Sequence, residues 1–119
     1  MPRTIISVNE LQEYLIGAAE RAEHHAQNIN RVILALAGAV ILFKDQGEDI
    51  RVKTYRGNLA NVLWVTINGV RYALSYNHTE ESVEIRRHSL QGEVVGSFDN
   101  DDNPREIIDT FTRLSSAPL

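Results

Sequence analysis

Apolar residues recur at alternating three- and four-residue steps over the first third of the chain. The stripe consists of Val8, Leu11, Leu15, Ala18, Ala22, Ile29, Val32 and Leu36, with His25 in the one polar place. This spacing is typical of one face of an amphipathic helix. Ser7 and Glu10 have the spacing of a capping box, in which each side chain bonds the backbone amide of the other residue. The pattern therefore predicts a long N-terminal helix that begins at Ser7.

The C-terminal end of this helix is its least determined boundary. Residues 27–30 include weak helix formers, but the stripe continues beyond them in register. We expect the helix to end near Ala37, with a break at Gly38 and a first strand from Ala39 to Lys44. The alternative is a strand that already starts at Arg31, because periodicity does not separate helix from strand in a run this apolar.

Beyond residue 44 the pattern changes to the alternation expected of a sheet. A turn over residues 45–49 and further turn signals separate short runs of apolar and polar residues. The predicted strands are Ile50–Tyr55, Val62–Ile67, Val70–Tyr76, Ser82–His88 and Glu93–Phe98. Asn68 and Gly69 tolerate the two positive φ values of a type I′ turn, so they predict a tight hairpin.

A last helix is predicted directly after Asn103, which is a favourable N-cap. Pro104 follows at the first helical position and Glu106 at the third. Its apolar face consists of Ile107, Ile108, Phe111 and Leu114. The chain thus reads as a single α+β domain over residues 1–119. We expect a long N-terminal helix, an antiparallel meander of about five strands and a C-terminal helix, with both helices on one face of the sheet.

The two-residue turn fixes which residues of the hairpin stand opposite each other. Ile67 pairs with Val70, so Trp64 pairs with Ala73, and side chains alternate between the two faces. The predicted core face carries Leu63, Val65, Ile67, Val70, Tyr72 and Leu74. The opposite face carries Val62, Trp64, Thr66, Arg71, Ala73 and Ser75.

This second face is the candidate functional surface. Extending the alternation to neighbouring strands gathers basic and aromatic residues on it, with Glu84 as the one acid. The candidate ligand-binding residues are Arg51, Lys53, Tyr55, Trp64, Arg71, Arg86 and His88. Three interpretations stay open: a solvated sheet face, a subunit interface, and a platform on which a base or other planar ligand stacks while the arginines bind phosphate or carboxylate.

The amino-acid composition excludes some classes of site and disfavours some classes of partner. The 119 residues include 16 acidic and 12 basic side chains, for a net charge of −4, and contain no cysteine. Thiolate metal sites, disulfides and cysteine nucleophiles are thereby excluded. The acidic balance disfavours nucleic acid as a partner. The first residues do not resemble a secretory signal, and the apolar run Val32–Phe43 is too short to span a membrane, so we expect a cytoplasmic protein without a membrane partner.

Three polar motifs contain residue types that could bind a metal or act in catalysis. Glu20 and His24 are four residues apart and could face one metal, but they supply only two ligands. The acidic segment 99–103 resembles the start of a calcium loop until Pro104 replaces the required glycine, which favours a solvated loop. His78 lies in a polar loop and could act as a general base, yet no nucleophile accompanies it. We therefore assign no catalytic residue, metal or cofactor.

The capped helix at Ser7–Glu10, the hairpin Leu63–Gly69 and the helix start at Asn103–Pro104 together resemble small single-domain proteins encoded in mobile integron gene cassettes. The resemblance implies a bacterial, often oligomeric protein and transfers no site residues.

The functional expectation is a non-enzymatic binding or protein-interaction module that works as a homodimer. About 30 helical residues would span roughly 45 Å, which exceeds what the predicted sheet covers, and uncovered apolar helix surface usually marks an interface. One alternative is a small ligand or single-stranded nucleic acid bound on the open face around Trp64. The other is a small hydrolase that uses the loop at His78.

Overall fold

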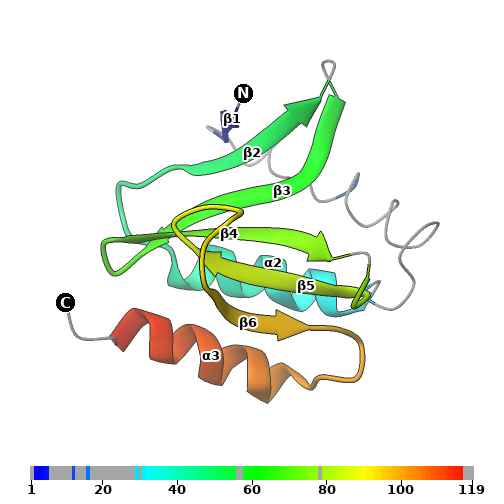
Figure 1. Ribbon diagram of the computed structural model, residues 1–119. Coiled ribbons are helices and arrows are strands. Elements are labelled where there is room, and N and C mark those ends of the chain that lie inside the picture. Colours follow the sequence, from blue (N-terminus) through cyan, green and yellow to red (C-terminus); the bar gives the residue numbers. More distant parts are fainter. Residues whose placement is uncertain are drawn as a thin grey trace.

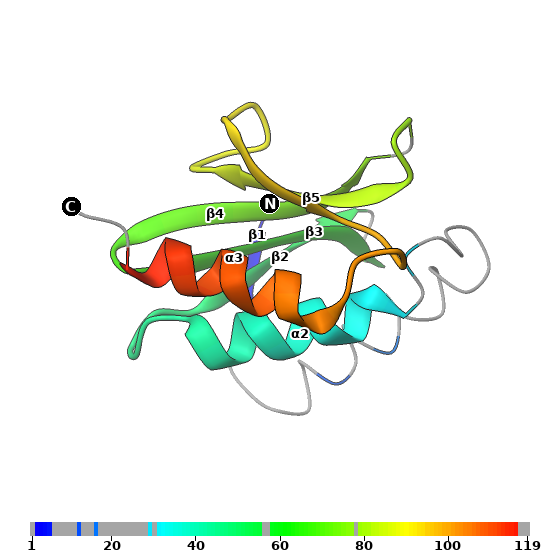
Figure 2. The ribbon, with the colours of Figure 1, turned by 90° about the horizontal axis from the view of Figure 1, so that it is seen from below.

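The computed structural model describes residues 2–5, 12, 16, 29, 31–55, 58–77 and 79–116. Its elements follow the order β1 (Pro2–Ile5), α2 (Val32–Phe43), β2 (Ile50–Tyr55), β3 (Asn58–Ile67), β4 (Val70–Asn77), β5 (Ser82–Arg87), β6 (Val94–Phe98) and α3 (Pro104–Ser116). The strands form one antiparallel six-stranded sheet in the order β1-β2-β3-β4-β5-β6. Figures 1 and 2 show α2 and α3 side by side on one face of this sheet. The α+β class and the antiparallel meander from β2 to β6 are confirmed.

The β3–β4 hairpin is built as its sequence indicates. Asn68 and Gly69 have φ values of 51° and 78°, as a type I′ turn requires. The pairing runs from Ile67 with Val70 to Val62 with Ser75, so the predicted register is correct. The predicted core face is also confirmed: Ile67 and Val65 are almost fully buried.

Helix α2 differs from its prediction. It runs through Gly38 to Phe43, so the predicted break at Gly38 and the strand from Ala39 to Lys44 are wrong, and so is the alternative strand from Arg31. Leu36, Ala39 and Val40 are all buried, which is the i, i+3, i+4 pattern of a helix packed on the sheet. The burial of this face outweighs the cost of about 1 kcal/mol for one helical glycine.

The N-terminus of α2 is capped from a distant part of the chain. Its N-cap residue, Arg31, contributes no capping side chain. Instead the Asn100 side-chain oxygen accepts hydrogen bonds from the backbone amides of Arg31 and Val32, at 3.0 and 2.9 Å. The helix therefore begins as its own element at Val32. The predicted continuous helix from Ser7 lies largely outside the described residues.

Strand β1 is an element that the sequence analysis did not predict. Its four residues pair with the edge of β2, Ile5 standing opposite Ile50. So short a segment has too few positions to show an alternation.

The core lies between the sheet and the two helices. Its largest fully buried side chains include Tyr72, Ile67 and Phe111, contributed by both layers. The rings of Phe43 on α2 and Phe111 on α3 have centroids 5.9 Å apart, which joins the helices to each other. The predicted start of α3 is confirmed, since the Asn103 side-chain oxygen accepts from the Glu106 amide at 3.1 Å.

Candidate functional site

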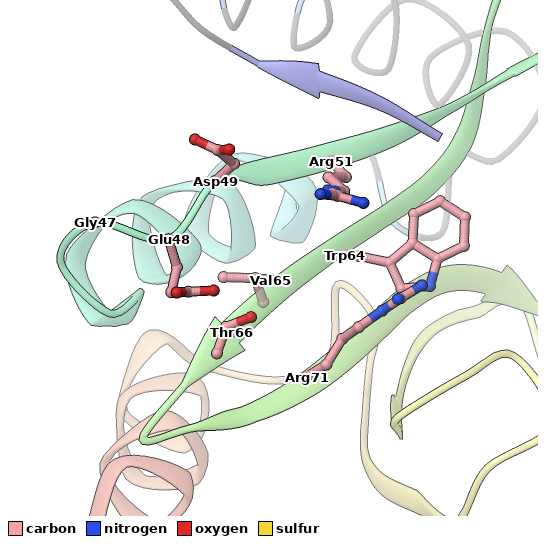
Figure 3. A pocket seen from close by; sticks show the side chains of 8 residues that line it. All are labelled: Gly47, Glu48, Asp49, Arg51, Trp64, Val65, Thr66 and Arg71. Atoms are coloured by element: carbon pink, nitrogen blue, oxygen red, sulfur yellow. The ribbon is translucent and has the colours of Figure 1, made fainter. Parts of the chain in front are cut away.

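A pocket of about 330 Å³ opens on the sheet face that carries Arg51 and Arg71 (Figure 3). Its lining comes from the loop before β2 and from strands β2, β3 and β4. The lining residues are Gly47, Glu48, Asp49, Arg51, Trp64, Val65, Thr66 and Arg71.

Strand register brings the central residues of this pocket together. Arg51 on β2 stands opposite Trp64 on β3, and Thr66 on β3 stands opposite Arg71 on β4. Arg51 and Arg71 are exposed, whereas the core neighbour Val52 is fully buried. The alternation of side chains thus places both arginines on the face away from the helices.

The loop that ends the pocket is tied to the β3–β4 hairpin by Asp45. The two oxygens of its carboxylate accept from the backbone amides of Asn68 and Gly69, at 2.7 and 2.8 Å. The Asp45 amide donates to the Thr66 carbonyl at 2.9 Å. On the other side, the Lys44 ammonium donates to the Glu48 carbonyl at 2.7 Å. These bonds hold residues 45–48 against the end of the sheet.

Trp64 is buried, with 9% of its surface exposed, so its ring does not present an open face for stacking. The Arg71 guanidinium carbon lies 5.3 Å from the centroid of the indole ring, in the arrangement of a cation–π contact. Ala73, its neighbour on β4, is also fully buried. The indole nitrogen is buried and has no hydrogen-bond partner in the described part of the chain.

The pocket unites three of the seven candidate ligand-binding residues, namely Arg51, Trp64 and Arg71. Lys53 is half-buried on β2, next to an irregularity in the pairing with β3. Tyr55 belongs to β2, but its side chain lies outside what the structure describes. His88 follows β5 instead of ending it and has a positive φ of 70°.

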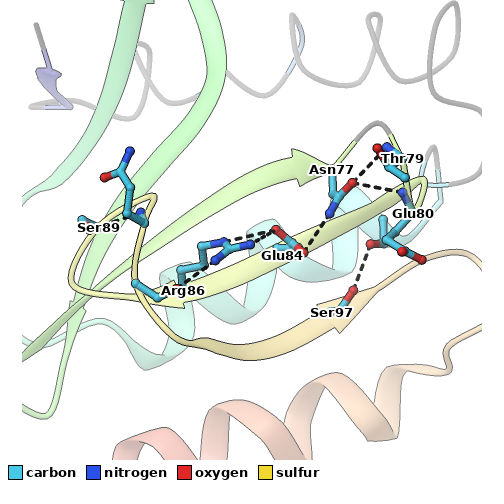
Figure 4. A network of polar contacts seen from close by, with 10 residues as sticks. Asn77, Thr79, Glu80, Glu84, Arg86, Ser89 and Ser97 are labelled. Atoms are coloured by element: carbon cyan, nitrogen blue, oxygen red, sulfur yellow. Dashed lines mark hydrogen bonds and ion pairs between the residues drawn. The ribbon is translucent and has the colours of Figure 1, made fainter.

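Arg86 is engaged in a separate polar network on β4 and β5 (Figure 4). Its guanidinium donates to one Glu84 oxygen at 3.1 and 3.2 Å and to the Gly92 carbonyl at 2.9 Å. The other Glu84 oxygen accepts from the Asn77 amide group at 2.9 Å. Arg86 therefore serves the structure of the sheet and does not reach the pocket.

The pocket also contains residues that sequence reasoning missed. Gly47, Glu48 and Asp49 line it, although their sequence indicates only a turn. Their position depends on the reach of the Asp45 side chain to a turn 23 residues later. No local pattern in the sequence signals such a contact.

The other polar motifs show structural roles where they are described. The Asp102 carboxylate accepts from the Asp99 amide at 2.9 Å, and Asp99 accepts from the Asp101 amide at 2.8 Å. A hydrogen bond to Asp102, with a smaller effect of burial, raises the pKa of Glu106. Within the described residues, no group of three or more metal-ligating side chains occurs. Glu20, His24, His25 and His78 lie outside the described residues.

A second surface of interest lies on the outer side of α2. Leu34, Ile41 and Leu42 are 60%, 49% and 74% exposed. Gly38 is also exposed, and a Cβ atom added to it would meet no atom within 4 Å. No helix in the described part of the chain is long and apolar enough to cross a membrane.

Comparison with other proteins places the chain in a family. Comparison with curated proteins gives no match. The model of a family described as integron cassette protein VCH_CASS1 chain matches residues 11–107, which is most of the 119-residue sequence. The resemblance inferred from the capped helix and the hairpin is thereby confirmed, and the chain belongs to this family of integron cassette proteins.

Proposed function

We propose that this protein is a non-enzymatic interaction module that works as a homodimer, with the outer side of α2 as the contact surface. The observation that carries the proposal is the exposed apolar row of α2, formed by Leu34, Gly38, Ile41 and Leu42. None of the twelve residues of α2 is charged or polar. Its inner side already packs on the sheet through Leu36, Ala39 and Val40. The outer side is therefore apolar without serving the core of its own subunit.

The geometry of the row favours a second copy as the occupant. Leu34, Gly38 and Leu42 are spaced by four residues and form one ridge along α2. A twofold interface requires a surface that is complementary to itself. Two antiparallel copies of α2 that cross at Gly38 place Leu34 of each helix against Leu42 of the other.

Gly38 also allows this crossing to be close. It projects no side chain, and the space beside it is open. Small residues at a crossing point let two helix axes approach, so the flanking leucines can bury more surface. A charged partner would find no complementary charge on α2 itself. These features support self-association over the capture of a different protein.

The molar mass in solution tests the proposal. Light scattering coupled to size exclusion is expected to give twice the chain mass of 13.4 kDa for the native protein at micromolar concentration. Leu42→Glu places a charge at the most exposed position of the row and is expected to give the mass of one chain. Circular dichroism of the variant checks that the fold is retained.

Val94→Glu is the matched control, because Val94 is also exposed, at 43%, but lies on β6. It is expected to leave the dimer intact. A native mass of one chain across the micromolar range, or a dimer unaffected by Leu42→Glu, would overturn the proposal.

A further inference from the structure

Two arginines in the pocket on β2–β4 have no carboxylate partner among the residues that the structure describes. In the described part of the chain, Arg86, Arg87 and Arg105 each pair with an acidic side chain. Arg51 and Arg71 form no such pair with any described residue, although both line the same pocket. Two guanidinium groups that no described carboxylate neutralises, both lining one pocket, make it a favourable place for negative charge.

The indole of Trp64 adds an independent observation. Its N–H group is buried without an acceptor among the described residues, and 9% of the surface of Trp64 is exposed. Buried donors normally have a partner, because burial removes the hydrogen bond that water would supply. Trp64 lines the pocket, so a bound group can supply the missing acceptor once a side chain that covers the nitrogen, such as Arg71, shifts.

The hydrogen-bond donors of the pocket lie close to one another, whereas its two carboxylates lie away from them. Figure 3 shows the nitrogen edge of the indole beside the end of the Arg71 side chain, with Arg51 directed toward the same region. The Asp49 carboxylate points away from the indole, and Glu48 lies toward the other end of the pocket. The region around the indole nitrogen therefore offers hydrogen-bond donors and positive charge.

These features select the chemistry of the ligand. Arg71 lies over the face of the indole, so a stacked nucleobase would compete with it for that face. An acceptor group with a negative charge instead satisfies the arginines and the indole nitrogen together. A pocket of about 330 Å³ matches the smaller sites that bind metabolites.

We infer that Arg51, Trp64 and Arg71 form a site for a small ligand that carries an oxyanion, either a carboxylate or a phosphate group. The site lies on the sheet face opposite the helices, so it does not depend on the proposed dimer contact on α2. A variant that no longer binds the ligand can therefore still be tested for dimer formation, and a variant that no longer dimerises can still be tested for ligand binding.

The single tryptophan of the chain provides the readout. Inorganic phosphate and benzoate are titrated separately, with chloride at the same ionic strength as the reference, and Trp64 emission is followed. We expect a saturable change with at least one of the two anions that chloride does not produce. Saturation by phosphate alone assigns a phosphate-bearing ligand, saturation by benzoate alone assigns a carboxylate, and saturation by both assigns a general oxyanion site.

Calorimetry on variants shows whether the named residues are responsible. Arg51→Gln and Arg71→Gln are each expected to weaken binding by at least about tenfold, since each removes a charge-assisted hydrogen bond. Trp64→Phe keeps an aromatic ring but removes the N–H donor, and is expected to weaken binding as well. Arg105→Gln is the control, because that side chain is 82% exposed on α3. No saturable response to either anion in the native protein, or native affinity in both arginine variants, would overturn the inference.

Discussion

The two helices pack on the same face of one sheet, but their outer sides differ in kind. Helix α3 buries Ile107, Phe111 and Leu114 and turns charged residues outward, including Arg105 and Asp109, which form an ion pair of 3.3 Å. Helix α2 buries a comparable apolar face, yet its outer side is apolar too. The charged side chains on the outer side of α3 are hydrated by solvent. The apolar side chains on the outer side of α2 would leave water only by contact with another molecule.

This difference teaches which part of a helix pattern serves the fold. One apolar face is sufficient to pack a helix on a sheet. On α3 this face is Ile107, Phe111 and Leu114, whereas Ile108, predicted to belong to it, is 48% exposed and is the one large apolar residue on the outer side. The second apolar face of α2 adds nothing to the packing of its own subunit. It also removes the contrast between polar and apolar positions from which a helix is recognised in a sequence.

The largest expected effect comes from the buried side of α3. Phe111 is fully buried and touches Phe43 across the two helices. Phe111→Ala is expected to lower the free energy of unfolding by about 3–5 kcal/mol, because it removes apolar contacts and leaves a cavity. Urea unfolding followed by Trp64 emission measures this. Leu42→Ala, at low protein concentration, is the comparison and is expected to change the value by less than about 0.5 kcal/mol. Equal losses in both variants would contradict the distinction between the two sides.

A smaller effect is expected at the link between the segment before α3 and the start of α2. Asn100→Ala removes the acceptor for the backbone amides of Arg31 and Val32. We expect a loss of about 1–2 kcal/mol, as for the removal of other helix caps. The same urea experiment measures it, with Asp101→Ala as a control at an exposed neighbouring position. A loss no greater than that of the control would show that this cap contributes nothing to stability.

The smallest effect has opposite signs for folding and for self-association. Gly38→Ala is expected to raise the free energy of unfolding by about 0.5–1 kcal/mol at low concentration, because alanine favours the helix and the added methyl group meets no atom. The same methyl group lies at the proposed crossing point and is expected to weaken the dimer. Urea unfolding and sedimentation equilibrium measure the two quantities. Stabilisation together with a tighter dimer would place the crossing elsewhere on α2.

Sequence patterns predicted the part of the site that depends on local geometry. The two-residue turn at Asn68 and Gly69 determined the hairpin register, which brought Trp64 and Arg71 to the same face. The outward position of Arg51 followed from the alternation along its own strand.

What the sequence did not predict depends on contacts between distant segments. The burial of Trp64 involves the Arg71 side chain lying over its ring, and the alternation of residues does not specify that rotamer. The loop with Glu48 reaches the pocket only because Asp45 bonds the turn at Asn68 and Gly69. The apolar run Val32–Phe43 is compatible with a helix or a strand by its sequence pattern, and it forms a helix because that places one of its faces against the sheet.

The two edges of the sheet have a consequence for aggregation. The outermost strands, β1 and β6, contain only four and five residues, and the pairing of β6 with β5 is irregular between Ile85 and Arg86. The Arg113 guanidinium also donates a hydrogen bond to the Val95 carbonyl of β6, at 3.0 Å. Short, irregular and partly occupied edges resist the edge-to-edge addition of strands from other molecules. The chain can therefore expose an apolar helix surface while the short edge strands of its sheet disfavour the addition of strands from other molecules.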